Sequence, residues 1–525
     1  MNRRFLAVLP LSLLALTLVL ALWGAAVQAA PAAPERFFIR PIQLDLKAND
    51  LVYDAGRDVL WASSPADAGS HADSVTPIGR DGAIGAGIPV GSEPNRLALS
   101  ADGRYLYVGL DGEGAVRRVD LTTGTAGLEW SLGESQTGSC GPLSVQDMAV
   151  PADDPHTVVI SRRTTSGCSP YNEGVVVYTD GVMRPEAIID DAQINVLEPS
   201  SAPATFYGYT NENSGFDFHV MATNANGITT TAKLTGLLDG YDVDMVYAGG
   251  AIYATSGAVV DVDTLTLAEP FEAWGLVVPD PVARRVYFID TSYYRLPLFR
   301  AFDMDTRALL FEAEMPPFPD EPGSHAARAF VGLGDNLFAF ISTDNSVYLL
   351  TLFEGYEVSG RVAGRDGNSL DGVVVSAGPG YSDTTAGDGT YTLGLPAGSF
   401  TLTVTREGYA FDPPSRQVTV PPNLPGQDFV GWQPVYTITG HIVDEAGQPL
   451  PGVYVRRDDT DATYSLGGGV YTFHNLPPGQ YRIAPRSSLY TFSPAYRIVD
   501  VPPDGLDIDF VAHSPLKRAY LPTVR

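Results

Sequence analysis

The sequence predicts an all-β protein, and three observations lead to this class. Gly and Pro account for 54 and 41 of the 525 residues, which is typical of many tight turns between short strands. A pattern of alternating apolar and polar residues recurs about every 46 residues over the first two thirds of the chain. A second repeat, of about 80 residues, fills the last third. Because 44% of the residues are apolar, the chain has enough hydrophobic side chains to form folded cores.

The first thirty residues, 1–30, have the pattern of a secretory signal peptide. Arg3 and Arg4 precede an uncharged run that ends in the small residues Val27-Gln28-Ala29, so we expect cleavage after Ala29 or Ala30. An uncleaved anchor is the alternative, because the run is also long enough to span a bilayer. Cleavage would give a chain that is secreted or held at the cell surface, with no further segment for membrane insertion.

The charge balance excludes nucleic acid as a partner. The chain has 33 Lys and Arg against 61 Asp and Glu, a formal charge of −28, and its only lysines are Lys47, Lys233 and Lys517. Binding to phosphate backbones or to anionic bilayers depends on clusters of cations, and no such cluster occurs. We expect a monomeric chain whose partner is a surface protein or the class of ligand implied by the C-terminal modules described below.

Cys140 and Cys168 are the only cysteines. In an oxidising compartment an even pair predicts a disulfide, which would stabilise the fold by about 3–4 kcal/mol. The alternative is a reactive thiol or a metal pair. It has no CxxC motif or nearby histidine to support it.

Residues 94–124 show the shorter repeat most clearly. Leu97 and Leu99 alternate with other residue types, Asp102-Gly103 forms a turn, and two further strands with turns follow. Equivalent strand pairs start at residues 50, 96, 147, 195, 244, 275 and 328. Seven units with this period predict a seven-bladed β-propeller over residues 37–354. The apolar strand 37–46 has no partner in its own unit, so we expect it to pair with 347–353 and close the ring.

The segment PNRLALSADGRYLYV, followed by AVRRVDLTTG, resembles the YVTN type of repeat. Such repeats occur in propellers of bacterial surface proteins and of lactonase-like enzymes. The other six units are degenerate, so for them the resemblance extends only to the architecture.

The last third contains two similar modules, residues 356–432 and 436–512. Gly360 corresponds to Gly440, and Tyr391 corresponds to Tyr471. Each module has the size of a β-sandwich. The joints between the parts are short, so we expect the modules to form a semi-rigid stalk and the whole chain to be elongated. No pattern assigns a role to the tail, residues 513–525.

The run SGRVAGRDGNSLDGVVVSAG, followed by TTAGDGTYTLGLPAGSFTLTVTREGY, closely resembles the carboxypeptidase-regulatory-like module, a prealbumin-like or starch-binding-like fold. The resemblance implies carbohydrate as the leading ligand class. It does not imply a peptidase, since no HxxE or HExxH zinc pair occurs. Aromatic side chains that can stack on sugars or pack between strands are Tyr381, Tyr409, Trp432, Tyr454 and Tyr490.

No motif assigns a catalytic residue or a metal site. The seven histidines are scattered, and neither a GxSxG elbow nor a P-loop occurs. The pairs Asp261/Asp263 and Asp303/Asp305 resemble calcium ligands but lack the rest of the loop. We expect these aspartates to cap turns.

Alignment of the first strand of each unit places several polar residues at one equivalent position. These ring residues are Asp50, Arg96, Asp147, Asn195, Asp244 and Arg328, with Gly275 in the sixth unit. The inner strands of a propeller line its central channel, so this set should surround one end of that channel. One account has the arginines pair with the aspartates and fill the channel. In the other, the ring binds a polar ligand or, through its oxygens, Ca²⁺.

The sequence therefore predicts an exported or cell-surface binding or adhesion protein. Its propeller presents a ligand face, and its sandwich modules act as a stalk or contact carbohydrate. No cofactor is expected apart from the Ca²⁺ alternative. The alternative function is a hydrolase of the lactonase type, with Asp147 or Asp244 as general base and Arg96 stabilising an oxyanion. The absence of a histidine from the ring favours the binding function.

Overall fold

The structure is a computed structural model that describes residues 36–135, 140–164, 171–189, 193–290, 298–315, 327–458 and 460–514. It is built from strands, with two short 3-10 turns at Gly69–His71 and Gly467–Gly469. Within these residues, no helix is long and apolar enough to cross a membrane. The predicted signal peptide, Cys168 and most of the tail lie outside them. Cys140 is buried, and its pairing with Cys168 stays a prediction.

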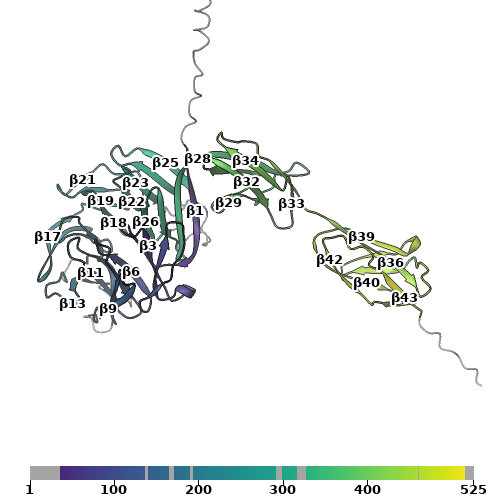
Figure 1. The fold of residues 1–525 in the computed structure, drawn as a ribbon, viewed down its shortest axis with the longest axis horizontal. Helices are drawn as coiled ribbons and strands as arrows, with labels where there is room; N and C mark the ends of the chain where they lie inside the picture. The colour runs from purple at the N-terminus through teal and green to yellow at the C-terminus, as the bar shows by residue number, and fades with distance from the viewer. Residues whose placement is uncertain are drawn as a thin grey trace, which may run out of the picture.

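Six four-stranded antiparallel sheets follow one another along residues 50–314, each with its strands paired in chain order. They are β2 (Asp50–Asp54), β3 (Val59–Ser64), β4 (Ser74–Gly79) and β5 (Ile88–Pro89); β6 (Pro94–Leu99), β7 (Tyr105–Leu110), β8 (Ala115–Asp120) and β9 (Thr125–Ser131); β10 (Leu143–Ala149), β11 (Thr157–Thr164), β12 (Asn172–Thr179) and β13 (Val182–Met183); β14 (Val196–Pro199), β15 (Thr205–Tyr209), β16 (Asp217–Asn224) and β17 (Gly227–Thr235); β18 (Met245–Ala248), β19 (Ala251–Ala254), β20 (Val259–Asp261) and β21 (Thr266–Ala268); and β22 (Gly275–Asp280), β23 (Arg285–Asp290), β24 (Leu298–Asp303) and β25 (Leu309–Glu314). They resemble propeller blades and together form one rounded body (Figure 1).

A further sheet joins the two ends of this body. It consists of β26 (Ala329–Gly334), β27 (Leu337–Ile341), the first part of β28 (Ser346–Gly364) and β1 (Arg36–Lys47). β1 runs antiparallel to β28, from Arg36 opposite Gly355 to Lys47 opposite Ser346. The predicted pairing of strand 37–46 with residues 347–353 is confirmed. An unpaired edge strand would leave a row of backbone N–H and C=O groups without partners, and the pairing of β1 with β28 satisfies them.

Apolar side chains between neighbouring sheets hold the body together. One buried cluster combines Leu44 and Leu46 of β1 with Leu60 of β3 and Leu349 of β28, so it joins the last sheet to the first. Burying each such side chain contributes about 1.5–3 kcal/mol. The contact between the last sheet and the first is therefore a packed interface, in addition to the pairing of β1 with β28.

The last third contains two β-sandwiches with the same strand order. In the first, β30 (Tyr381–Thr384), β29 (Val374–Gly378), β32 (Gly398–Thr405) and β34 (Ser415–Val420) form one sheet; β31 (Thr390–Leu395), the end of β28, β35 (Phe429–Trp432) and β33 (Ala410–Asp412) form the other. In the second, β38 (Asp461–Tyr464), β37 (Tyr454–Arg457), β40 (Gly479–Arg486) and β42 (Arg497–Val501) face β39 (Val470–Leu476), β36 (Tyr436–Asp444), β43 (Phe510–His513) and β41 (Thr491–Ser493). The hydroxyls of Tyr391 and Tyr471 each donate to a backbone carbonyl at equivalent places.

The first sandwich is attached to the propeller-like body without a loop. β28 continues from one into the other as a single strand of 19 residues. Beside it, the Phe38 ring of β1 lies against Gly394 of the sandwich, and Arg40 donates to the Tyr381 hydroxyl at 3.3 Å. The second sandwich lies further out, so the chain is elongated (Figure 1).

The aspartates that resemble calcium ligands cap turns, as expected. The Asp261 carboxylate accepts hydrogen bonds from the backbone N–H groups of Asp263 and Thr264. The Asp303 carboxylate is bonded in the same way by Asp305 and Thr306. These bonds lower the pKa of Asp261 and of Asp303, because they stabilise the ionised form.

Candidate functional site

A cavity of about 870 Å³ lies where the innermost strands β2, β6, β10 and β14 converge. Four of the predicted ring residues line it, namely Asp50, Arg96, Asp147 and Asp244. Arg96 and Asp244 are solvent-exposed, whereas Asp50 and Asp147 are half-buried. The cavity is thus open to water although protein surrounds it.

The three aspartates are positioned by one repeated backbone contact. Each carboxylate accepts a hydrogen bond from the backbone N–H of the next residue, at 2.9 Å for Asp50, 2.9 Å for Asp147 and 2.8 Å for Asp244. This bond folds the short side chain back onto its own strand. The carboxylates are therefore held in similar orientations in three different sheets.

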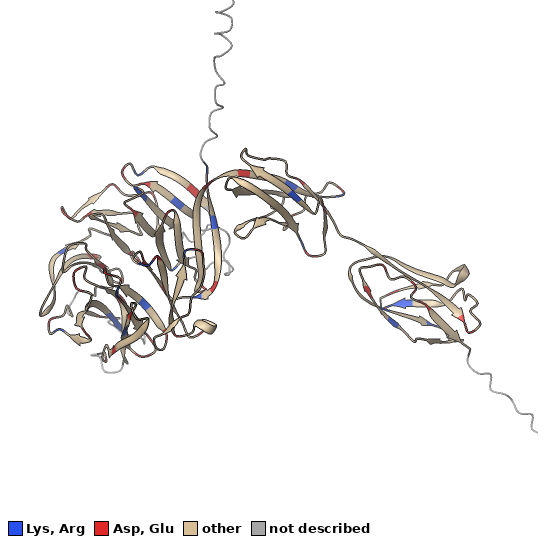
Figure 2. Cartoon of the chain, viewed as in Figure 1, with Lys and Arg blue, Asp and Glu red and all other residues tan. Residues whose placement is uncertain are grey.

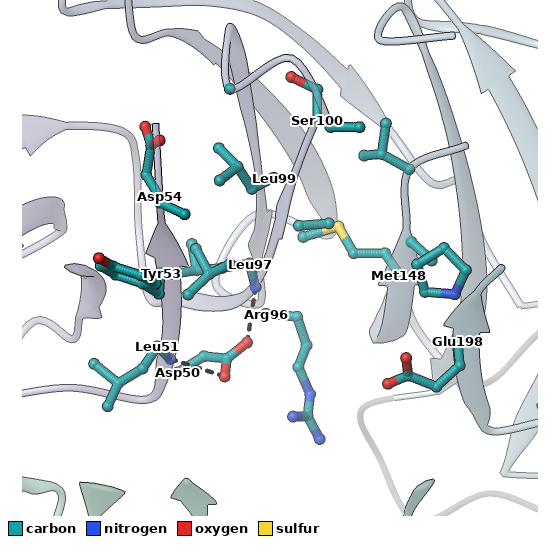
Figure 3. A pocket seen from close by; sticks show the side chains of 18 of the residues that line it. Asp50, Leu51, Tyr53, Asp54, Arg96, Leu97, Leu99, Ser100, Met148 and Glu198 are labelled. Atoms are coloured by element: carbon teal, nitrogen blue, oxygen red, sulfur yellow. Dashed lines mark hydrogen bonds between the residues drawn. The ribbon is translucent and has the colours of Figure 1, made fainter. Parts of the chain in front are cut away.

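Two of these carboxylates also connect neighbouring sheets. The second oxygen of Asp50 accepts from the Leu97 N–H at 2.9 Å, and the second oxygen of Asp147 accepts from the Leu197 N–H at 2.7 Å. Figure 3 shows both bonds of Asp50. No such second bond reaches Asp244 in the described part of the chain. One oxygen of Asp244 therefore remains available to a ligand.

Arg96 extends into the cavity between Asp50 and Glu198 (Figure 3). Its Nε donates to the backbone oxygen of Gln146 at 3.0 Å, which fixes the side chain from one side only. Among the described residues, its two terminal nitrogens have no hydrogen-bond partner and form no ion pair. The account in which Arg96 is neutralised by direct pairing with the aspartates does not fit this geometry.

The electrostatics of the cavity favour the protonated forms of its carboxyl groups. Burial raises the pKa of Asp147 to about 7; nearby Arg96 opposes this shift, and nearby Asp244 adds to it. Desolvation by the protein that surrounds the cavity likewise raises the pKa of Asp50 and of Asp244, again against the effect of Arg96. The protein that surrounds the cavity also desolvates Arg96, which opposes its charge, but the nearby carboxylates outweigh this effect and raise the pKa of Arg96. Arg96 thus stays charged among carboxyl groups that titrate nearer to neutral pH.

Glu198 is a cavity residue that the sequence analysis missed. It lies in β14, and one of its oxygens accepts from the Tyr247 N–H at 3.3 Å. Burial raises its pKa well above the usual value, and Asp244 and Asp147 add to this effect. The alignment placed Asn195 at the ring position of this unit, and Glu198 lies three residues further along the chain. A carboxylate within the apolar strand Val196–Pro199 was the available signal.

The remaining ring residues serve other contacts. Asn195 is buried just before β14 and forms hydrogen bonds with Asn211, which follows β15 of the same sheet. Arg328 donates to Asn345, which in turn donates to Asn49 at 3.2 Å and so connects the last sheet to the first. A side chain at Gly275 would collide with the Ile289 carbonyl. These three residues do not line the cavity.

Within the described residues, no group of three or more His, Cys, Asp or Glu side chains is arranged to hold a metal ion. The carboxyl groups of the cavity come from different sheets and are spread around it. The Ca²⁺ alternative rests only on the oxygen chemistry of these residues.

The aromatic residues selected from the sequence have different surroundings. Tyr381 packs against Phe353 at the junction with the propeller-like body, and Trp432 lies under the Arg365 guanidinium at 3.8 Å. Tyr409 and Tyr490 line shallow hollows at equivalent places in the two sandwiches. Tyr454 is exposed on a sheet face.

The comparisons with known proteins identify one domain. Residues 357–427 match the family model of the carboxypeptidase regulatory-like domain, which supports the predicted resemblance of the first sandwich. No curated protein matches the chain.

Solved structures with similar folds include hydrazine synthase of Kuenenia stuttgartiensis, with a TM-score of 0.43 and 14% identity over 63% of this chain and 99% of that chain. The β-propeller domain of Cps50 (Swd1) from Myceliophteria thermophila has a TM-score of 0.45 and 12% identity, and the match covers 61% of this chain and 99% of that chain. A chain of a mitotic checkpoint complex has a TM-score of 0.42 and 13% identity, and the match covers 67% of this chain and 100% of that chain.

Proposed function

We propose that this is an exported or cell-surface binding protein that holds a polar, hydroxyl-rich ligand such as a sugar in the channel of a seven-bladed propeller. Propeller-like sheets followed by β-sandwiches suggest a binding or scaffold role in general. The YVTN-like repeat and the N-terminal signal pattern support the more specific assignment. The two sandwiches serve as a stalk that holds the propeller away from a surface.

The observation that carries this proposal is the unsatisfied polar chemistry of the cavity. The Arg96 guanidinium offers hydrogen-bond donors, and the free oxygen of Asp244 and the second oxygen of Glu198 can each accept a hydrogen bond or, when protonated, donate one. A hydroxyl group both donates and accepts, so a ligand with several hydroxyls can satisfy both kinds of group. A volume of about 870 Å³ lies in the range of small-molecule sites.

A specific observation also supports the alternative hydrolase function. A pKa of about 7 for Asp147 would let that group accept and return a proton near neutral pH. Arg96 lies on the same cavity and carries the charge that an oxyanion needs. Against this, both Asp147 oxygens are held by backbone N–H groups, which gives the residue a structural role.

Calorimetric titration of the chain from residue 31 tests the binding function. The probes are glucose, galactose, glucuronic acid, maltose and cellobiose. We expect at least one to bind, and Arg96→Met to weaken that binding at least tenfold. Arg284→Met, which removes an exposed arginine paired with Asp305 on the outside, is the matched control and should have no effect. Absence of binding by every probe would contradict the proposal.

A parallel assay with a panel of lactones separates the two functions. The binding function predicts no turnover. Turnover that is lost in Asp147→Asn would instead establish the hydrolase.

A further inference from the structure

The two sandwiches differ on one exposed sheet face. In the second sandwich this face belongs to β38, β37, β40 and β42, and in the first to β30, β29, β32 and β34. The register is equivalent, because Tyr454 lies opposite Tyr464 and Arg486 just as Val374 lies opposite Thr384 and Thr405. The inward residues are apolar in both sandwiches. The side chains on the outer face can therefore be compared position by position.

On the first sandwich the outer face consists mainly of small hydroxyl residues. Thr384, Thr401 and Thr405 occupy it, with Ser399 bonded to Thr419. On the second sandwich the counterparts of those three threonines are Tyr464, Arg482 and Arg486. The duplicated module thus keeps its core but exchanges hydroxyl groups for aromatic rings and guanidinium groups.

The exchanged residues form a continuous row. Tyr464, Tyr454 and Arg486 lie side by side on three adjacent strands, about 10 Å from end to end. The two tyrosine rings are 5.3 Å apart and are 58% and 36% exposed. At the Arg486 end the row reaches a shallow hollow of about 500 Å³ that is also lined by Tyr490.

A second group extends this face toward β42. The Arg482 guanidinium lies 4.3 Å from the centre of the Tyr496 ring, and Ile498 beside it is 49% exposed. Neither Arg482 nor Arg486 forms an ion pair within the described residues. Unpaired arginines on one face are unusual in a chain with a charge of −28, whose acidic residues are spread over all its parts (Figure 2).

We propose that this face of the second sandwich binds an acidic polysaccharide. Arginine forks pair with carboxylates through two parallel hydrogen bonds, and exposed tyrosine rings pack against the apolar C–H faces of sugar rings. An open face with a row of such groups can contact several successive units of an extended polymer. Charge complementarity selects an anionic polymer rather than a neutral one.

This inference rests on the proposed carbohydrate-binding role but uses a surface separate from the channel. Affinity electrophoresis of the chain from residue 31 tests it, with alginate and polygalacturonate as probes and dextran as the neutral polymer. We expect both acidic polymers to retard the protein, less so at high salt, and dextran to have no effect.

The test variant is Arg482→Thr/Arg486→Thr, which installs the residues of the first sandwich at the same positions. It should weaken retardation at least tenfold. Tyr454→Val/Tyr464→Thr, built on the same principle, should weaken it as well. Arg406→Ser, which removes an arginine from the hollow of the first sandwich, is the matched control and should behave like the parent chain.

Two results would overturn the inference. One is unchanged retardation of the arginine variant. The other is equally tight binding of poly-L-glutamate through the same arginines, which would indicate an acidic protein partner. Arg96→Met separates the two proposals, because it should weaken sugar binding in the channel at least tenfold and leave retardation by the polymers unchanged.

Discussion

The Asp147 carboxylate of one sheet accepts a hydrogen bond from the Leu197 N–H of the next sheet at 2.7 Å. The same carboxylate faces the channel and has a pKa of about 7. One residue therefore joins two sheets and contributes to the charge of the cavity. A ligand that changes the ionisation of Asp147 would act directly on a contact between sheets.

The raised pKa of Asp147 predicts a pH dependence of stability. The folded state binds its proton more tightly than the unfolded state, so this stabilising effect is complete below about pH 4 and is lost as the pH rises through about 7. Asp147→Asn removes the titration. In thermal denaturation, the melting temperature of the variant relative to the parent should increase from pH 5 to pH 8. Asp120→Asn, at the end of β8, should show no such trend over this range. A flat difference for Asp147→Asn would contradict the prediction.

Asp50 is predicted to stabilise the contact between the first two sheets. Asp50→Ala leaves the N–H groups of Leu51 and Leu97 without their acceptor, which should lower the free energy of unfolding by about 1–3 kcal/mol. Asp50→Asn keeps one acceptor oxygen and should cost less. Urea denaturation measures both variants. Equal losses would show that the bonds to the carboxylate are not the cause.

His219 should destabilise the fold in mild acid. It is buried, neither ring nitrogen has a hydrogen-bond partner in the described residues, and burial lowers its pKa to about 4. The unfolded state therefore binds a proton between about pH 6.5 and 4 that the folded state does not, and stability falls over that range. His219→Phe should raise the melting temperature at pH 5 more than at pH 8. A gain that is the same at both pH values would show that only packing has changed.

The junction with the first sandwich depends on Gly394. An added methyl group there would collide with the Phe38 ring, so Gly394→Ala should destabilise the chain by about 1–3 kcal/mol. In the Phe38→Ala background the same change should cost much less. This double-mutant cycle isolates the contact between β1 and β31. Additive effects of the two substitutions would contradict a direct contact.

The sequence predicted the architecture better than the cavity. The closure of β1 on β28 followed from an apolar strand without a local partner, and the second module followed from aligned pairs such as Tyr391 and Tyr471. The ring was predicted only in part, because the alignment assumed the same strand start in every unit. In this unit β14 begins at Val196, one residue after the aligned position. Asn195 therefore bonds to Asn211 instead of lining the cavity, and Glu198 lines the cavity in its place.

The pairing of charges also could not be predicted from the sequence. Arg96 and three aspartates occupy the same channel, but the Gln146 carbonyl holds the guanidinium by its Nε, and backbone N–H groups bind both oxygens of Asp50 and of Asp147. These contacts depend on backbone positions in neighbouring sheets. A sequence pattern does not contain them.

A crystal structure of the chain with the sugar that binds most tightly in the calorimetric titration tests the central claim most directly. The account predicts the sugar in the channel, with a hydroxyl or carboxylate oxygen at hydrogen-bond distance from a terminal nitrogen of Arg96 and a hydroxyl donating to Asp244 or Glu198. A sugar bound elsewhere, with the channel unchanged, would contradict it.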